Sequence, residues 1–140
     1  AKYPDARVIS IDIMAEAQSL ESLPVHFRSR LHYENFDIKN FTLDALAEMV
    51  QRNCGRSLGD VYAYHFSPDC STYTTADKGR NNFRNDDGSA NKTRAQLSDD
   101  NVTKVMSVLR ELTHIHPDQM ITCENPSTGI RLVLHSCYRY

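Results

Sequence analysis

The 140-residue sequence contains no tryptophan, only five glycines, and four cysteines that lie far apart without forming a Cys-x-x-Cys pair. Zinc sites and secreted disulfide frameworks usually need closely spaced or dense cysteines, so this spacing argues against both. We therefore expect free thiols in an intracellular protein. No apolar run approaches the roughly 18 residues of a membrane span, and no signal-peptide core opens the sequence.

An excess of basic charge is also missing, because 16 Lys and Arg residues face 18 Asp and Glu residues for a formal net charge of -2. This balance argues against a protein that coats nucleic acid by charge alone, although it leaves room for a local basic patch. The hydrophobic and charged contents of 40% and 24% are ordinary for a globular chain. The length predicts a single domain over residues 1–140.

Apolar, β-branched segments alternate with segments of helical spacing along the chain. A helix is predicted from Thr42, its N-cap, to a stop at Gly55, and a longer one with Ser98 as its N-cap. A short helix is predicted over residues 14–23, and a loop over residues 71–96. Strands are predicted over residues 7–13, 30–38, 59–66 and 118–125, with a fifth candidate over 130–140. This alternation predicts an α/β fold with a mostly parallel sheet.

Polar side chains follow four of these predicted strands. In a parallel sheet all carboxyl ends lie on one edge, where α/β proteins keep their chemistry. We therefore expect this edge to hold Asp12, Asp37, Cys70 and Glu124.

Cys70 lies in "HFSPDCSTYTT", directly after a strand and before the long loop. It is either an idle thiol at a turn or a nucleophile whose thiolate is stabilised by nearby cations. Glu124, in "ITCENP", is either a turn-stabilising carboxylate or a group that donates a hydrogen bond or proton to a substrate.

The loop between residues 71 and 96 carries interspersed basic residues, which form either a solvated loop or a lid that reaches nucleic-acid phosphates. The candidates for phosphate contact are Lys78, Arg80 and Arg84. Histidines could also be metal ligands, but Pro117 ends a predicted helix just after His116, and we expect no metal site. The histidines weighed as ligands are His65, His114 and His116.

The order strand-Asp, strand-Asp, strand-"SPDC", long loop, helix, strand-"ENPSTG" resembles the cytosine-5 DNA methyltransferases over about residues 7–129. The resemblance implies the Rossmann-like sheet of methyltransferases that use S-adenosylmethionine. It implies catalytic roles for Cys70, Glu124 and Asn125. It also implies that S-adenosylmethionine is bound by Asp12 at its ribose, by Asp37 at its adenine, and by Pro68.

The chemistry implied by the family begins when a thiolate, here that of Cys70, adds to C6 of a cytosine flipped out of DNA. Glu124 assists at N3 of the ring. C5 then takes the methyl group, and loss of the C5 proton with release of Cys70 restores the base. The partner implied is therefore DNA, and no membrane is involved.

Two departures from the family pattern keep other functions open. Asp69 stands directly before Cys70, where the family usually has proline, and a carboxylate there disfavours the thiolate. The glycine-rich loop that usually precedes the Asp12 strand is not in the sequence, so we expect a fragment, a divergent relative or a reduced core, incomplete at its N-terminus, that binds the cofactor weakly or not at all. One alternative is a degenerate methyltransferase-like domain that binds nucleic acid or a protein partner. A thiol hydrolase using Cys70 and His65 is another, without an oxyanion-loop pattern to support it.

Overall fold

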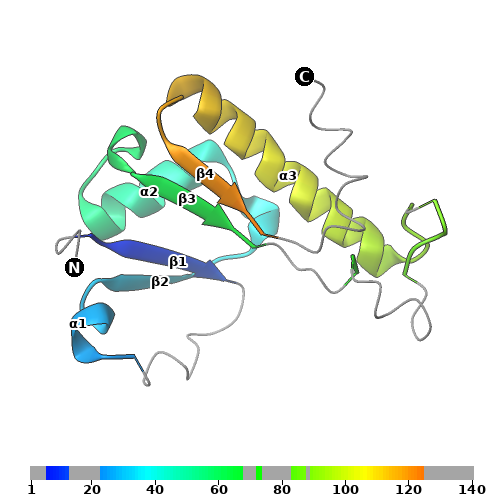
Figure 1. Cartoon of the computed structure of the whole chain (residues 1–140), viewed down its shortest axis with the longest axis horizontal. Helices are drawn as coiled ribbons and strands as arrows, with labels where there is room; N and C mark the ends of the chain where they lie inside the picture. Colours follow the sequence, from blue (N-terminus) through cyan, green and yellow to red (C-terminus); the bar gives the residue numbers. More distant parts are fainter. Residues whose placement is uncertain (1–5, 13–22, 68–71, 74–82, 88, 125–140) are drawn as a thin grey trace. The chain divides into compact units, whose positions relative to one another are not determined.

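The computed structural model describes residues 6–12, 23–67, 72–73, 83–87 and 89–124 (Figure 1). The chain divides into two compact units, residues 1–61 and 62–140. Each unit holds one pair of parallel strands next to helices, so the structure is mixed α/β. The predicted fold class and the parallel direction of the strands are thus confirmed at this level. One Rossmann-like sheet, and one catalytic core over residues 1–140, stay predictions.

The first unit contains the parallel pair β1 (Val8–Asp12) and β2 (Leu31–Asn35), with Asp12 opposite Asn35. Both predicted strands are confirmed, but β1 is only partly buried and β2 ends before Asp37. The second strand is shorter than predicted because Ile38–Asn40 turn into the 3-10 helix η2. Helix α1 (Val25–Arg28) begins after Pro24, while the helix predicted over residues 14–23 lies outside the described residues except at its last position.

Helix α2 (Leu43–Cys54) has the ends that the sequence predicts. The Thr42 hydroxyl accepts a hydrogen bond from the Ala45 backbone nitrogen at 3.1 Å. Gly55 ends the helix with a φ of 64°, in the left-handed region that favours glycine. One face of α2 is buried through Leu46, Met49 and Val50.

Hydrogen bonds and an ion pair connect the last turn of α2 to Glu34 on strand β2. The Glu34 carboxylate accepts hydrogen bonds from the side chains of Asn53 and Arg52, the latter at 2.9 Å. The pKa of Glu34 is lowered, chiefly because Asn53 donates to its carboxylate and secondarily because Arg52 does. These contacts therefore stabilise the first unit through the ionised form of Glu34.

The second unit contains the parallel pair β3 (Ala63–Phe66) and β4 (Met120–Cys123), joined by the long helix α3 (Thr93–Ile115) (Figure 1). A parallel pair with a helix in its connection is the β-α-β arrangement that the alternation predicts. Both predicted strands are confirmed, although β3 is shorter because Leu58–Asp60 form the 3-10 helix η3. The candidate strand over residues 130–140 lies outside the described residues.

Helix α3 begins at Thr93, five residues before the predicted N-cap, and this prediction was wrong. Ser98 is buried inside the helix, where its hydroxyl donates to the Arg94 carbonyl oxygen at 3.1 Å. Serine can bond back to the preceding turn in this way instead of capping a helix. The connection after Cys70 is therefore shorter than predicted.

The core of the second unit lies along one stripe of α3. Its buried side chains recur at intervals of three and four residues, and Leu109 and Leu112 are 2% and 0% exposed. Replacing a leucine buried to this degree with alanine typically costs about 2–5 kcal/mol. The stripe consists of Ala95, Val102, Val105, Met106, Val108, Leu109 and Leu112.

Candidate functional site

The carboxyl ends of β3 and β4 bring the beginnings of two predicted motifs together. Phe66 opposes Cys123 in the strand register, and the Glu124 backbone nitrogen donates to the Phe66 carbonyl oxygen at 2.8 Å. The next residue of β3, Ser67, donates its hydroxyl to Glu124 Oε2 at 2.8 Å. Ser67 opens the "SPDC" motif and Glu124 opens "ENPSTG", so the two motifs begin side by side.

Five of the predicted site residues lie outside the described residues. These are Pro68, Cys70, Lys78, Arg80 and Asn125. Cys70 follows Ser67 by three positions, and Asn125 follows Glu124 by one. The contact at the strand ends involves Ser67 and Glu124 themselves, and the roles of the five residues stay predictions.

A second polar contact crosses the same strand pair one position earlier. His65 Nδ1 and Thr122 Oγ1 are 2.9 Å apart, and these two residues face each other in the register. The Thr122 hydroxyl also lies 3.3 Å from the Tyr64 carbonyl oxygen. His65 is thus engaged with the neighbouring strand, and nothing in this contact supports a role as base for a cysteine hydrolase.

The two predicted cofactor carboxylates belong to the carboxyl ends of the strand pair in the first unit. Asp12 is the last residue of β1, and Asp37 follows the end of β2 by two positions. The Asp12 carbonyl oxygen accepts from the Phe36 backbone nitrogen at 2.8 Å. Asp37 follows that nitrogen by one residue, and its Oδ1 accepts from the Lys39 backbone nitrogen at 2.9 Å. Asp37 therefore caps η2, as the turn-forming role of an aspartate predicts.

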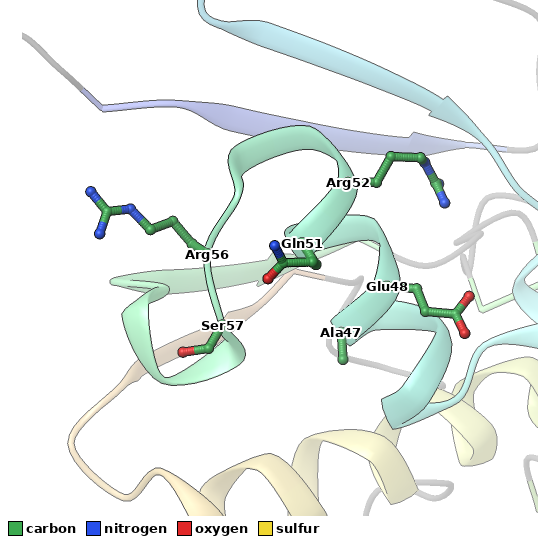
Figure 2. A pocket seen from close by; sticks show the side chains of 6 residues that line it. All are labelled: Ala47, Glu48, Gln51, Arg52, Arg56 and Ser57. Atoms are coloured by element: carbon green, nitrogen blue, oxygen red, sulfur yellow. The ribbon is translucent and has the colours of Figure 1, made fainter.

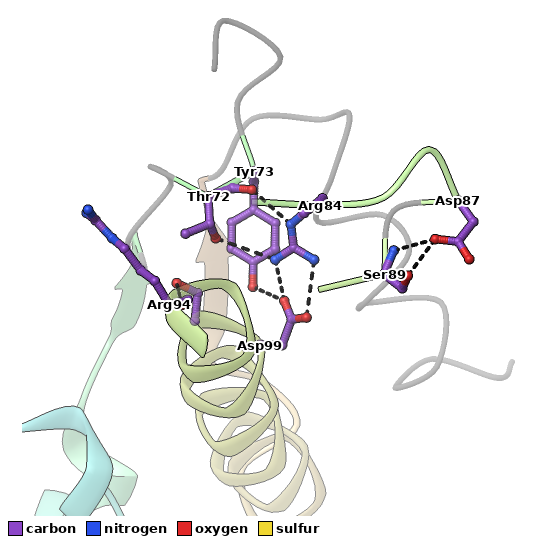
Figure 3. Close-up of polar contacts among 8 residues, drawn as sticks. Thr72, Tyr73, Arg84, Asp87, Ser89, Arg94 and Asp99 are labelled. Carbon is purple, nitrogen blue, oxygen red and sulfur yellow. Dashed lines mark hydrogen bonds and ion pairs between the residues drawn. The ribbon is translucent and has the colours of Figure 1, made fainter. Parts of the chain in front are cut away.

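Arg84 is engaged within the second unit by a cluster of polar contacts, which we name the Arg84 cluster: Thr72, Tyr73, Arg84 and Asp99 (Figure 3). Its guanidinium forms two hydrogen bonds to the Asp99 carboxylate, at 2.5 and 3.2 Å. Arg84 Nε donates to the Thr72 carbonyl oxygen at 2.8 Å, and Arg84 Nη2 lies 3.4 Å from the Thr72 hydroxyl. The phosphate contact predicted for Arg84 stays a prediction.

Tyr73 completes the cluster. Its ring lies 4.2 Å from the Arg84 guanidinium carbon, and its hydroxyl donates to Asp99 Oδ1 at 2.8 Å. Tyr73 is 2% exposed. Burial, together with the hydrogen bond to Asp99, raises the pKa of Tyr73 far above that of a free tyrosine, so it remains a neutral donor.

Sequence reasoning missed Ser67, Tyr73 and Asp99. Ser67 carried a signal, since it is the first polar residue after a strand and stands in the quoted motif. Tyr73 is one of few bulky residues in its loop, which favours an anchor. Asp99 carried no local signal, because its partner Arg84 lies 15 positions away.

Two exposed cations stand near the start of α3. The Lys92 ammonium and the Arg94 guanidinium lie 5.6 and 5.5 Å from the centre of the Phe83 ring. Phe83 precedes Arg84, which forms an antiparallel bridge with Ala90. Two cations thus lie beside one aromatic ring, on the segment for which the sequence leaves open a solvated loop or a phosphate-binding lid.

The first unit has an open hollow of about 570 Å³ on α2 and the turn that follows it (Figure 2). Its lining mixes one acidic and two basic side chains with small polar groups. None of the predicted catalytic or cofactor residues lines it, and we assign it no function. The lining residues are Ala47, Glu48, Gln51, Arg52, Arg56 and Ser57.

Other kinds of site receive no support from the described part of the chain. Within it, no group of three or more His, Cys, Asp or Glu side chains is arranged to hold a metal ion. None of the helices that the structure describes has the length and apolar character needed to cross a membrane.

Comparisons with protein-family models, with curated proteins and with solved structures find no match for this chain.

Proposed function

We propose that the protein is a DNA cytosine-5 methyltransferase, or the catalytic core of one, that uses S-adenosylmethionine. The observation that carries the proposal is the contact between Ser67 and Glu124 at the ends of parallel strands. In the family that the sequence resembles, the cysteine and glutamate motifs act on the same base and must begin next to each other. Parallel pairing brings the two strand ends together, and the hydrogen bond from Ser67 then holds the Glu124 carboxylate at the start of the cysteine motif.

The proposed roles follow from the residue types. Cys70 attacks C6 of the target cytosine, and Glu124 holds N3 of the same ring while Ser67 fixes the direction of its carboxylate. Asn125 follows Glu124 directly and supports its backbone turn. Positioned acid–base groups of this kind contribute about 10²–10⁴-fold to a rate.

The carboxylates of the first unit suit the nucleoside part of the cofactor. Asp12 would accept from ribose hydroxyls and Asp37 from the adenine amino group, both near the carboxyl ends of paired parallel strands, with Pro68 as a further contact. When bound, S-adenosylmethionine supplies an electrophilic methyl group. The chain's own task there is to hold the adenosine and exclude water.

DNA is the proposed partner. A cytosine is reachable only after it leaves the base stack, and the strand that is opened must be held through its phosphates. Lys78 and Arg80 are the proposed contacts, and we propose an intracellular location, where DNA is found.

Covalent trapping tests this function. DNA carrying 5-fluorocytosine should form a stable adduct with the protein in the presence of S-adenosylmethionine, because fluorine cannot leave C5 as a proton does. Cys70→Ala should abolish the adduct, and the matched control Cys54→Ala should keep it. Cys54 is a free, partly buried thiol of the first unit. An adduct that survives in Cys70→Ala would assign the nucleophile to another residue.

A second candidate function is favoured by Asp69, whose carboxylate stands next to the thiol in sequence. A degenerate domain would bind nucleic acid or a protein partner without methyl transfer. Asp69→Pro restores the usual family residue and separates the two candidates. In an active enzyme it should raise or preserve the trapping rate, whereas a degenerate domain should bind DNA and form no adduct with or without this substitution.

A further inference from the structure

We propose that Arg84 and Asp99 are positioning residues that hold Thr72 and Tyr73, the part of the chain two and three positions after Cys70. This inference rests on the proposed function for its catalytic consequence. Its structural part, the holding of Thr72 and Tyr73, stands on the contacts of the Arg84 cluster alone.

The first set of contacts lies before the cysteine. Ser67 continues β3 and is hydrogen-bonded to Glu124, whose backbone nitrogen is itself bound to Phe66. The backbone of Phe66 and the side chain of Ser67 are thus both bound to Glu124. The chain therefore leaves the sheet at one defined place.

The second set of contacts lies after the cysteine. Thr72 and Tyr73, two and three positions beyond Cys70, are 4% and 2% exposed. Arg84 binds the carbonyl oxygen of Thr72 and covers the ring of Tyr73, while Asp99 accepts the tyrosine hydroxyl. These contacts hold Thr72 and Tyr73 in place within the second unit.

The cluster is built to be stiff. The side chain of Arg84 is 10% exposed and that of Asp99 is 25% exposed, so water competes poorly for their charges. Asp99 stands on α3, one position after buried Ser98, and the helix gives the carboxylate a firm base. A planar guanidinium presents five donors in a fixed fork and can bind the carboxylate and the Thr72 oxygens at once, whereas an ammonium is a compact point charge without that fork.

This arrangement distinguishes positioning from a phosphate contact. A phosphate contact needs a positive charge, which Arg84→Lys retains. The positioning role needs the fork of donors, which Arg84→Lys removes. The same role also needs Asp99, whereas a DNA phosphate would be repelled by that carboxylate.

The experiment uses the whole protein with three variants: Arg84→Lys, Asp99→Asn and the milder Tyr73→Phe. Asp100→Asn is the matched control, because Asp100 is the exposed neighbour of Asp99 on α3. Thermal unfolding first identifies variants that remain folded at the assay temperature. Tyr73→Phe keeps the test decisive if the other two unfold, because it removes only the hydroxyl.

Hydrogen exchange and alkylation test the holding of Thr72 and Tyr73 without reference to methylation. In Arg84→Lys and Asp99→Asn, exchange in the peptide that contains Thr72 and Tyr73 should rise at least tenfold, with a smaller rise in Tyr73→Phe. Alkylation of Cys70 by iodoacetamide should become at least threefold faster, while that of Cys54 stays constant. Unchanged exchange and alkylation in the folded variants would overturn the inference.

Kinetics on 5-fluorocytosine DNA test the catalytic consequence. The trapping rate at saturating DNA should fall at least tenfold in Arg84→Lys and Asp99→Asn, with DNA affinity within twofold of the parent protein. The slope of log affinity against log salt should stay unchanged, whereas loss of one phosphate contact would reduce it by about 0.9. A reduced slope in Arg84→Lys, or trapping that stays normal, would overturn the positioning role. Absence of trapping in the parent protein would instead refute the proposed function and leave the exchange result to stand by itself.

Discussion

The contact between Arg84 and Asp99 allows a stability prediction with a worked magnitude. Breaking a fully buried ion pair by removing one partner typically costs about 3–5 kcal/mol. Here the side chains are 10% and 25% exposed, so water relieves part of that cost for Asp99. We expect Asp99→Asn to lower the free energy of unfolding by about 2–3 kcal/mol. Asparagine keeps the shape and an acceptor for Tyr73, so the loss reports mainly the missing charge.

The same logic gives the contribution of the Tyr73 hydroxyl. Hydrogen bonds to charged groups contribute about 1.5–3 kcal/mol, and Tyr73→Phe leaves the ring and its contact with Arg84 in place. We expect Tyr73→Phe to cost about 1.5 kcal/mol. The double variant should cost less than the sum of the two single ones, by about 1 kcal/mol, because Asp99→Asn weakens the hydrogen bond that Tyr73→Phe removes.

Urea unfolding at neutral pH measures these differences. Asp100→Asn serves as the control and should stay within about 0.5 kcal/mol of the parent protein, as exposed substitutions usually do. Raising the salt concentration to 1 M should shrink the effect of Asp99→Asn only slightly, because a pair with little exposure is poorly screened. A cost below about 0.5 kcal/mol for Asp99→Asn, or additive single variants, would refute the reasoning.

Three further predictions concern other contacts. Ser67→Ala should lower single-turnover methyl transfer roughly tenfold with little change in DNA affinity, since only the direction of the Glu124 carboxylate is lost; an unchanged rate would contradict this. Burial raises the pKa of Tyr64 from 10.0 to about 12, so stability should fall as the pH rises from about 10 to 12, and the fall should be smaller in Tyr64→Phe by urea unfolding. The pKa of Glu34 is lowered, so its contribution is present above about pH 4.5 and lost as the pH falls through the lowered value. Glu34→Gln should cost roughly 1 kcal/mol at neutral pH and flatten that acid dependence in the same assay.

Local chemistry explains which parts of the fold could be predicted from the sequence. The ends of α2 follow from Thr42 and Gly55, each of which acts within its own turn. The strands were found by their apolar, β-branched composition, and their parallel direction by the helix between β3 and β4. Helix α3 was placed too late because its first turn carries few apolar residues, and its N-cap position is occupied by Lys92 without a side-chain cap.

One part of the candidate site could be predicted from the sequence and another could not. The meeting of Ser67's strand end with Glu124 follows from parallel pairing, which a sequence reader can anticipate. The Arg84 cluster could not be anticipated, since it depends on how the segment closed by the bridge between Arg84 and Ala90 brings Arg84 to Asp99 on α3. Ion pairs across such distances leave no periodic pattern in the sequence.

The bond between Ser67 and Glu124 also has a consequence for folding. Its partners are 57 residues apart, so the two motifs can meet only after the chain has closed a loop that includes the whole of α3. Closing so long a loop carries an entropic cost that local helix formation does not, and contacts of this range form late in folding. A nascent chain released before β4 would thus carry the cysteine motif without its glutamate. The hydrogen bond between Ser67 and Glu124 would therefore come into existence only when the second unit is nearly complete.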